Sequence, residues 1–262
     1  PAPVVDVRRT MRGDTVIQGI TDVPELEVAR QLCLVVFELF SAINTREFLH
    51  AAWAAPGTKA FSHNLLAFVD HLEHVTLWVA SLIVTPTKLA ERQAMYARCI
   101  TIAHHLYDLQ NYSTARAFLD GLDHRSVVVL SDTTAANALA TTTSDELAAL
   151  KSVFDPFYGA VRNMPWNLTT PCVPVLSSFV SKMATVADIA TFQTLDGTEV
   201  VNWTKMTHVA DLSLRMASYQ SNAYPFQEDA PLQRILRLMP QRRDEHSLQE
   251  MSKERAAATA FS

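Results

Sequence analysis

The sequence predicts a single all-α domain, and three observations lead to this fold class. Glycine is scarce, at 6 of 262 residues, whereas the 12 prolines fall mostly between periodic apolar segments. This combination favours helices with short, firm connections over a sheet. Apolar residues make up 48% of the chain and charged residues 19%, which is typical of a globular domain with a sizeable core. We find no strand-pairing signal and no internal repeat.

The charge pattern and the cysteines exclude several classes of protein. The net charge is −5 and Lys and Arg are dispersed, so we expect no nucleic-acid partner. Cys33, Cys99 and Cys172 make an odd count without a CxxC motif, which indicates reduced thiols in a cytoplasmic protein. The apolar run Thr76–Val84 is too short to span a bilayer, and the first residues lack the apolar core of a signal peptide. We therefore expect no direct insertion into a membrane.

Capping signals predict where the first helices begin. The first helix is expected to begin at Asp22, a good N-cap, with Pro24 close to the first helical position. Asn44 and Glu47 have the spacing of a capping box, and they predict a short second helix that ends at Trp53.

Further helices follow from apolar periodicity and from helix breakers. The segment 62–83 is apolar on most sides, so it is expected to be the central helix. The Thr- and Ser-rich segment 131–144 is the best candidate for a mobile loop, and Pro156 is expected to bend the helix that follows it. The other predicted helices span 87–109, 113–121, 144–163, 229–238 and 246–254. The predicted boundaries are a linker at 1–20, one domain at 21–256 and a tail at 257–262.

Residues 171–206 predict two helices joined by a loop, with a Pro-rich entry. The first helix is expected at 175–186, because its apolar residues fall at i, i+3, i+4 and i+7. These apolar residues are Leu176, Phe179, Val180 and Met183. The second helix is expected to begin near Thr198 or Glu199 and to bury Trp203, Met206, Val209, Ala210 and Leu214. By pattern alone, this is an ordinary amphipathic pair in a helical protein.

Motifs for nucleotide binding and covalent catalysis are absent from the sequence. The chain has no GxxxxGK(S/T) or GxGxxG phosphate loop, and no GxSxG or HExxH motif. His71 with His74, and His104 with His105, could bind a metal, but thiolates and carboxylates lack the spacing of companion ligands. Hydrogen-bonded or exposed histidines are the better interpretation, so we expect no metal and no cofactor.

Other reactive side chains also have simpler interpretations. Cys172 lies between two prolines with nothing nearby to lower its pKa, so a packed thiol is favoured over a nucleophile. Asp70 with Glu73, or Asp120 with Asp123, could form acid–base pairs, but acidic residues on helices usually form solvated faces. A helical domain without covalent chemistry is most often a binding module.

Six stretches occur in a characteristic order along almost the whole chain. They are FELFSAINTREFLHAAW (37–53), NLLAFVDHLEHVTLWVASLIV (64–84), KLAERQAMYARCITIAHHLYDLQNYSTARAFLDGL (88–122), PCVPVLSSFVSKM (171–183), NWTKM (202–206) and SLQEMSKE (247–254). Together they resemble the catalytic domain of guanine-nucleotide exchange factors for Ras-family small GTPases. No single motif is highly specific, and the resemblance rests on the coincidence of all six.

The resemblance implies a helical bowl from which a helical hairpin protrudes. The bowl grips the second switch region of a Ras-, Rap- or Ral-like GTPase, and the hairpin moves the first switch region away from the nucleotide. The partner is then a small GTPase in its nucleotide-free state, with no proton transfer, covalent step or cofactor. The resemblance also implies flanking regulatory domains in the full-length protein, and a cytoplasmic location with recruitment to the membrane that anchors the GTPase.

The resemblance also assigns roles to individual residues. Those placed at the magnesium and phosphate site are Ser181, Lys182, Ala184 and Asp188. Those expected to bind the GTPase surface are Val69, Asp70, Leu72, Glu73, Arg116, Asp120, Leu122, Asp123, Arg125, Val128, Tyr158, Val175, Ser178 and His208.

Five of the expected contact positions depart from the pattern of the family. Asp70 replaces a residue that is often basic, and Arg116 one that is commonly aliphatic. Ala184 is smaller than the usual Leu or Thr, Asp188 is shorter than the usual Glu, and Ile189 stands where a glycine is expected. Either the partner GTPase carries matching changes, or exchange is weak or lost.

The sequence leaves open two alternatives to an active exchange factor. The first is a non-catalytic scaffold or GTPase-binding domain on the same fold. The second is an unrelated helical hydrolase, which would need a His–Asp or His–Cys pair in a pocket.

Overall fold

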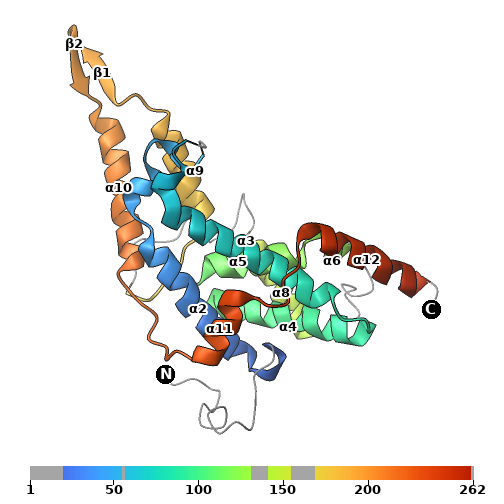
Figure 1. Ribbon diagram of the computed structural model, residues 1–262. Helices are drawn as coiled ribbons and strands as arrows, with labels where there is room; N and C mark the ends of the chain where they lie inside the picture. Colours follow the sequence, from blue (N-terminus) through green and yellow to red (C-terminus); the bar gives the residue numbers. More distant parts are fainter. Residues whose placement is uncertain (1–19, 55–56, 131–140, 155–168, 261–262) are drawn as a thin grey trace.

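The computed structural model describes residues 20–54, 57–130, 141–154 and 169–260, and it confirms the all-α fold (Figure 1). Four helices form the body of the domain, and each packs on at least two of the others. They are α2 (Glu25–Ala42), α3 (His63–Val84), α4 (Leu89–Asp108) and α5 (Tyr112–Leu122).

Helix α3 is the central helix, as its apolar sequence predicts. Phe68, Val75 and Val79 are fully buried and Trp78 is 1% exposed, so the helix contributes large side chains to the core. By length and composition alone, the segment Lys59–Val84 could cross a membrane, but half of its most apolar stretch is buried against the rest of the chain. The core position of α3 accounts for its hydropathy.

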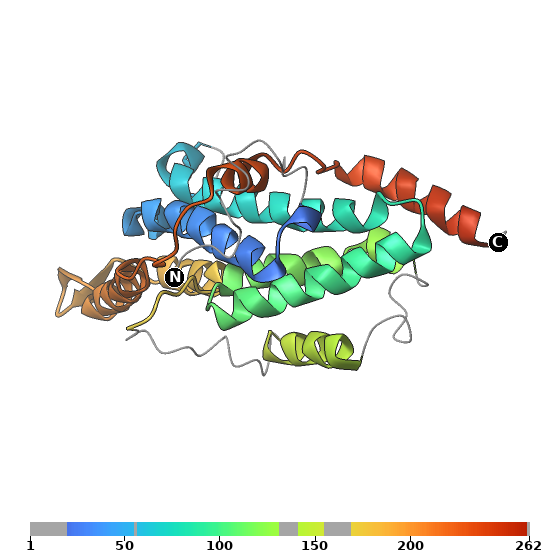
Figure 2. The same ribbon diagram turned by 90° about the horizontal axis from the view of Figure 1, so that it is seen from below.

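Shorter elements cover the body. Helix α8 (Thr141–Val153) lies along α4, as Figure 2 shows, and α11 (Ala230–Leu238) packs on α2. The C-terminal helix α12 (Glu245–Ala260) contacts α3 and the single turn α6 (Arg125–Val128). Within the described ranges, three 3₁₀ segments complete the shell. They are η1 (Ile20–Asp22), η2 (Thr45–Ala51) and η3 (Lys59–Ser62).

The capping predictions had mixed outcomes. Asp22 is not an N-cap, because it ends η1 and the cap position of α2 is Pro24. The capping box is confirmed, since the Asn44 amide donates to Glu47 Oε1 at 3.0 Å and the Arg46 amide to Asn44 Oδ1 at 3.0 Å.

The helical hairpin is present, but its connection differs from the predicted loop. Helix α9 (Leu176–Ala187) and helix α10 (Trp203–Gln220) are joined by two short antiparallel strands, β1 (Phe192–Leu195) and β2 (Thr198–Val201). The strands extend the hairpin beyond the body of the domain (Figure 1). The prediction that a helix begins near Thr198 is therefore wrong, because this residue opens β2.

The predicted inward face of α10 was also wrong in part. Trp203 is 75% and Leu214 65% exposed, and Ala210 is exposed as well. The buried residues of this helix are Lys205, Leu212, Met216 and Tyr219. Burial therefore follows a stripe that includes a lysine, which hydropathy alone does not identify.

The remaining predicted ranges agree with the structure to different degrees. Helix α8 begins at Thr141, so residues 141–144 are helical and not part of a loop. The rest of that predicted loop, 131–140, and the predicted bend at Pro156 lie outside the described residues. The predicted C-terminal helix is confirmed and is longer than expected, because α12 continues to Ala260.

Candidate functional site

A groove of about 470 Å³ lies between α3, α5 and α9, and Trp53 also lines it. Seven residues predicted to touch a partner line it. They are Val69, Leu72 and Glu73 from α3, Arg116 and Asp120 from α5, and Val175 and Ser181 from the α9 region. The structure thus brings together residues that are more than 100 positions apart in sequence. Asp70 lies just outside, in a shallower depression shared with Val69 and Glu73.

The groove has an apolar floor and a charged rim. Leu65, Phe68 and Leu176 form buried parts of the floor, and Leu72 and Val180 are half-buried. Apolar centres surrounded by polar rims are typical of surfaces that bind another protein.

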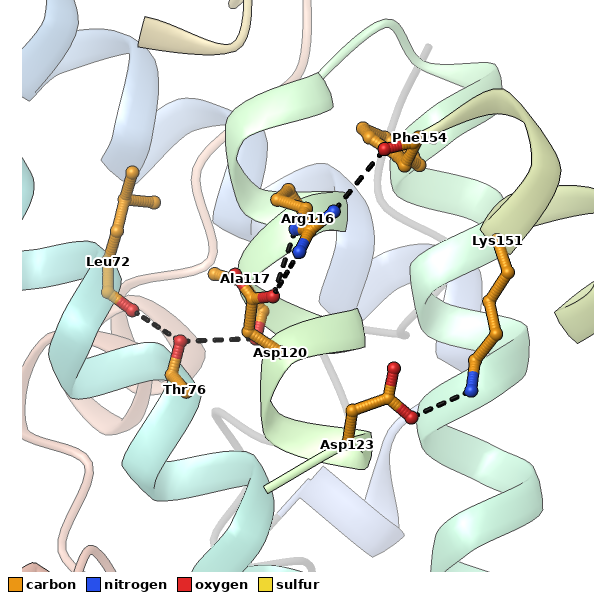
Figure 3. Close-up of polar contacts among 8 residues, drawn as sticks. All are labelled: Leu72, Thr76, Arg116, Ala117, Asp120, Asp123, Lys151 and Phe154. Atoms are coloured by element: carbon orange, nitrogen blue, oxygen red, sulfur yellow. Dashed lines mark hydrogen bonds and ion pairs between the residues drawn. The ribbon is translucent and has the colours of Figure 1, made fainter. Parts of the chain in front are cut away.

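Close packing fixes α5 against α3 beneath this groove. The Thr76 hydroxyl lies 3.1 Å from the Leu72 carbonyl oxygen and 3.2 Å from that of Ala117, so it bridges the two helices (Figure 3). One turn further along α5, a Cβ placed on Gly121 would lie 2.7 Å from Cβ of Val79. Only glycine allows this approach of the two backbones.

Arg116 is held by its own chain. Its Nε donates to Asp120 Oδ1 at 2.9 Å, and its Nη1 donates to the Phe154 carbonyl oxygen at 3.3 Å (Figure 3). The guanidinium therefore lies along the rim of the groove and joins α5 to the end of α8.

Other predicted contact residues lie beyond the groove. Asp123 pairs with Lys151 at 2.7 Å, and Arg125 pairs with Glu245 of α12 at 2.8 Å. Both pairs are exposed, as is Val128, so these residues remain candidates for partner contact.

Two of the predicted contact residues, Leu122 and Tyr158, are not on the surface that the structure describes. Leu122 is fully buried in the core, which contradicts its assignment to a contact surface; its i, i+4 relation to Phe118 places it on the inward face of α5. Tyr158 lies outside the described residues.

The base of the hairpin is bonded to the start of α5. The Ser113 hydroxyl donates to the Pro174 carbonyl oxygen at 2.5 Å, and the Tyr112 amide donates to the Val173 carbonyl oxygen at 2.9 Å. These bonds explain how the Pro-rich entry sets the direction of α9. Helix α9 also packs on η2.

The face of α9 that carries the predicted exchange residues is open. Ser181, Lys182 and Asp188 are exposed and Ala184 is half-buried. Ser178 is half-buried, and its hydroxyl donates to the Val175 carbonyl oxygen at 2.9 Å. His208 is exposed on α10.

The histidines do not form a metal site in the described part of the chain, where no group of three or more His, Cys, Asp or Glu residues converges. His74 lies 3.6 Å from Asp70 and His104 3.2 Å from Asp108, each pair one helical turn apart. Burial lowers the pKa of His71 to about 4.

Cys172 is a packed thiol, as predicted. It is 1% exposed, and burial raises the pKa of its thiol to about 12. The thiol form therefore dominates at neutral pH and the residue is a poor nucleophile.

Sequence reasoning missed several residues of the groove. Trp53, Leu65, Thr76 and Ser113 all line it. Leu65 and Thr76 could have been found from Val69 and Leu72, because the four residues follow one face of α3 at helical spacing. Ser113 could not, because its role depends on the distant Pro174 carbonyl.

Together, the fold and the groove define a helical binding domain with a projecting hairpin. The family model of the RasGEF domain matches residues 27–207, which is more than half of the chain. The chain belongs to the RasGEF family.

Curated relatives agree with this assignment. Ras guanine nucleotide exchange factor A of Dictyostelium discoideum is 38% identical over 109 residues, which are 42% of this chain and 18% of that protein. Ras guanine nucleotide exchange factor Q of the same organism is 26% identical over 82% of this chain and 16% of its own length. Protein son of sevenless of Drosophila melanogaster is 23% identical over 80% of this chain and 13% of its own length. The chain thus spans less than a fifth of the length of each of these relatives.

Proposed function

We propose that this chain promotes the release of guanine nucleotide from a Ras-family small GTPase. The relatives named as Ras guanine nucleotide exchange factors support this proposal. The observation that carries it is that α9 has one side in the groove and another side open to solvent. This helix lines the groove through Leu176 and Val180 and also presents Lys182 and Asp188 on its open face. A GTPase bound in the groove would therefore meet the exposed side of the hairpin.

The proposed mechanism is thermodynamic coupling. A partner switch region fills the groove, and the hairpin keeps the other switch region away from the nucleotide. Ala184 and Asp188 then occupy the space of the magnesium ion and the phosphate. Because binding free energies are reciprocal, a domain that prefers the nucleotide-free GTPase weakens nucleotide binding by the same factor. No proton transfer, covalent intermediate or cofactor is required.

The direct test is the release of a fluorescent guanine nucleotide from a panel of loaded Ras-, Rap- and Ral-like GTPases. We expect the wild-type chain to accelerate release from at least one of them. Asp188→Ala and Lys182→Glu should each slow that release about tenfold or more, because both change side chains that the mechanism places beside the magnesium ion and the phosphate. Lys253→Glu is the matched control, since Lys253 is exposed on α12. No acceleration with any member of a broad panel would contradict the proposal.

A non-catalytic GTPase-binding domain is the second candidate. Two observations favour it: Arg116 is engaged within its own chain, and Ala184 offers only a half-buried methyl group. This candidate predicts a stable complex with a GTPase whose rate of nucleotide release is unchanged. Binding and release measured on the same panel separate the two functions.

We also propose that the full-length protein acts in the cytoplasm, recruited to the membrane that anchors its GTPase, and that flanking domains regulate the hairpin. Fractionation of cells that express the tagged full-length protein tests the location. Exchange rates of the full-length protein and of this domain, compared on one GTPase, test the regulation.

A further inference from the structure

The neck of the hairpin, where α9 ends and α10 begins, contains a buried lysine. Lys205 lies in the first turn of α10 and is 8% exposed. Lysine is seldom buried to this extent unless its ammonium group has hydrogen-bond partners. The partners of Lys205 therefore indicate what the residue does.

All three partners of this ammonium group lie on the other arm of the hairpin. Lys205 Nζ donates to the carbonyl oxygen of Ile189 at 2.5 Å, to that of Ala187 at 3.3 Å and to Thr191 Oγ1 at 3.1 Å. Three acceptors match the three N–H donors of an ammonium group. The side chain thus ties α10 to the segment that follows α9.

The position of this charge also suits the end of α9. Ala187 is the last residue of the helix, so its carbonyl has no partner within the helix and lies at the negative end of the helix dipole. Helices often satisfy these carbonyls with a left-handed glycine after the cap. Here the residue after the cap Asp188 is Ile189, and Lys205 supplies the donors instead.

Asn202 adds a second connection at the same place. Its Nδ2 donates to the Ala190 carbonyl oxygen at 3.1 Å, and its amide donates to the Thr191 carbonyl oxygen at 2.9 Å. Its Oδ1 accepts from the Lys205 amide at 3.3 Å and so caps α10. We call Asn202, Lys205 and the segment 187–191 the neck clasp.

We propose that Lys205 is a positioning residue for nucleotide exchange, an inference that rests on the proposed function. Asp188 lies between Ala187 and Ile189, the two residues whose carbonyls Lys205 binds. The ammonium group therefore fixes the backbone on both sides of Asp188, while the Asp188 side chain stays exposed. Without this charge the segment is held mainly by Asn202, and the carboxylate of Asp188 samples more positions.

Lys205→Met removes the charge and keeps the length of the side chain. We expect the amides of Ile189 and Asn202 to exchange hydrogen about tenfold faster, the effect of losing one hydrogen bond to a charged group. The maximal rate of nucleotide release should fall about tenfold or more, because a displaced Asp188 carboxylate would fit the magnesium and phosphate site less well. Affinity for the nucleotide-free GTPase should change less than this rate, because the groove is intact. Lys253→Met, the same change on α12, should alter none of these quantities.

Chemical rescue separates the charge from a general loss of structure. Lys205→Cys can be alkylated with 2-bromoethylamine, which restores an ammonium group at nearly the original length. The wild-type chain treated with the same reagent is the control for alkylation of the three natural cysteines, which are buried with pKa values raised to about 12. We expect alkylation to restore slow amide exchange and most of the release rate.

Three results would overturn the inference. These are unchanged amide exchange in Lys205→Met, an unchanged maximal release rate, or failure of the alkylated protein to recover. If the wild-type chain released nucleotide from no GTPase, the proposed function and the role of Lys205 in exchange would both be wrong. Hydrogen exchange would still decide whether the neck clasp holds the hairpin.

Discussion

Arg116 and Asp120, one turn apart on α5, form an ion pair at the rim of the groove. Asp120 Oδ1 lies 2.9 Å from Arg116 Nε and 2.8 Å from Arg116 Nη2. The third nitrogen, Nη1, binds the Phe154 carbonyl oxygen. The guanidinium is thus oriented before any partner arrives, and a partner would meet a preformed charged edge and not a free arginine.

This arrangement predicts different effects of Arg116→Ala on folding and on exchange. The two side chains are 43% and 45% exposed, so the free energy of unfolding should fall by only about 0.2–1 kcal/mol, and less at high salt. The rate of nucleotide release should fall more, about tenfold, because Arg116 lines the groove and is already oriented for a partner by Asp120 and Phe154. Urea unfolding and fluorescent nucleotide release measure the two effects. Equal exchange rates for variant and wild type would show that Arg116 is not part of the contact surface.

The contact between Gly121 and Val79 predicts a large effect on stability. In Gly121→Ala the new methyl carbon would lie 2.7 Å from Cβ of Val79 and 2.8 Å from the Thr76 carbonyl oxygen. We expect α3 and α5 to separate slightly, with a loss of about 1–3 kcal/mol in the free energy of unfolding. Gly57→Ala is the control, since its methyl group would meet no atom of the described residues within 4 Å. Chemical unfolding of both variants should show the difference, and equal stabilities would disprove the packing argument.

The turn of the β-hairpin predicts a local effect. Asp196 and Gly197 have φ values of 51° and 78°, as a two-residue turn between antiparallel strands requires. Alanine at position 197 should cost about 1–2 kcal/mol there, because a Cβ disfavours left-handed φ. Nuclear Overhauser contacts between Phe192 and Val201, which are paired across the strands, should weaken. Melting of the whole domain should not change, because both strands are almost entirely exposed. Asp196→Asn keeps the turn preference and should leave these contacts intact.

The fold could be predicted from the sequence wherever helical periodicity or capping was strong. The central helix α3 and the capping box of Asn44 and Glu47 follow from local patterns that the tertiary structure preserves. The β-hairpin was missed although Asp196-Gly197 is a strong turn signal, because its strands bury no apolar face and so lack alternation. The inward face of α10 was assigned incorrectly because a buried cation, Lys205, replaces an apolar residue.

The candidate site was predictable only in part. Its composition came from the resemblance to the family, and the structure shows that residues such as Val69, Arg116 and Val175 share one groove. Leu122 was assigned to the contact surface by the resemblance alone, whereas it lies one turn after Phe118 and is buried with it in the core. The neck clasp could not be foreseen, since the acceptors of Lys205 are two backbone carbonyls and one hydroxyl that lie 14 to 18 positions away in sequence.

Glu47 predicts a dependence of stability on pH. It is 2% exposed, and its carboxylate accepts from the Asn44 amide, the Leu65 amide at 2.9 Å and Asn64 Nδ2 at 2.9 Å. Burial by itself would raise the pKa of this carboxyl, but these hydrogen bonds together lower it below its usual value of 4.5. The stabilisation is therefore complete above about pH 4.5 and is lost as the pH falls through the lowered pKa.

Glu47→Gln tests this relationship. At neutral pH we expect a loss of about 1.5–3 kcal/mol in the free energy of unfolding, since the amide nitrogen would face a backbone donor. The difference in the free energy of unfolding between variant and wild type should shrink below the lowered pKa, because protonated Glu47 is uncharged like glutamine. Unfolding curves at a series of pH values measure this, with the exposed Glu91→Gln as control. A difference that stays constant into strong acid would show that the charge of Glu47 is not the cause.

The acidic rim of the groove predicts how the partner approaches. Three carboxylates lie at or beside the rim, those of Asp70, Glu73 and Asp120. Arg116 pairs with only one of them, Asp120. The electrostatic field of such a carboxylate cluster changes association rates more than dissociation rates. We therefore expect a basic surface on the partner. At low salt, Asp70→Lys should associate severalfold more slowly than wild type. In about 1 M salt, where charges are screened beyond about 3 Å, the difference should disappear. Glu250→Lys on α12 makes the same change in net charge and should have a much smaller effect. Faster association of Asp70→Lys would instead indicate an acidic partner surface, and stopped-flow binding to the GTPase found in the panel distinguishes the two.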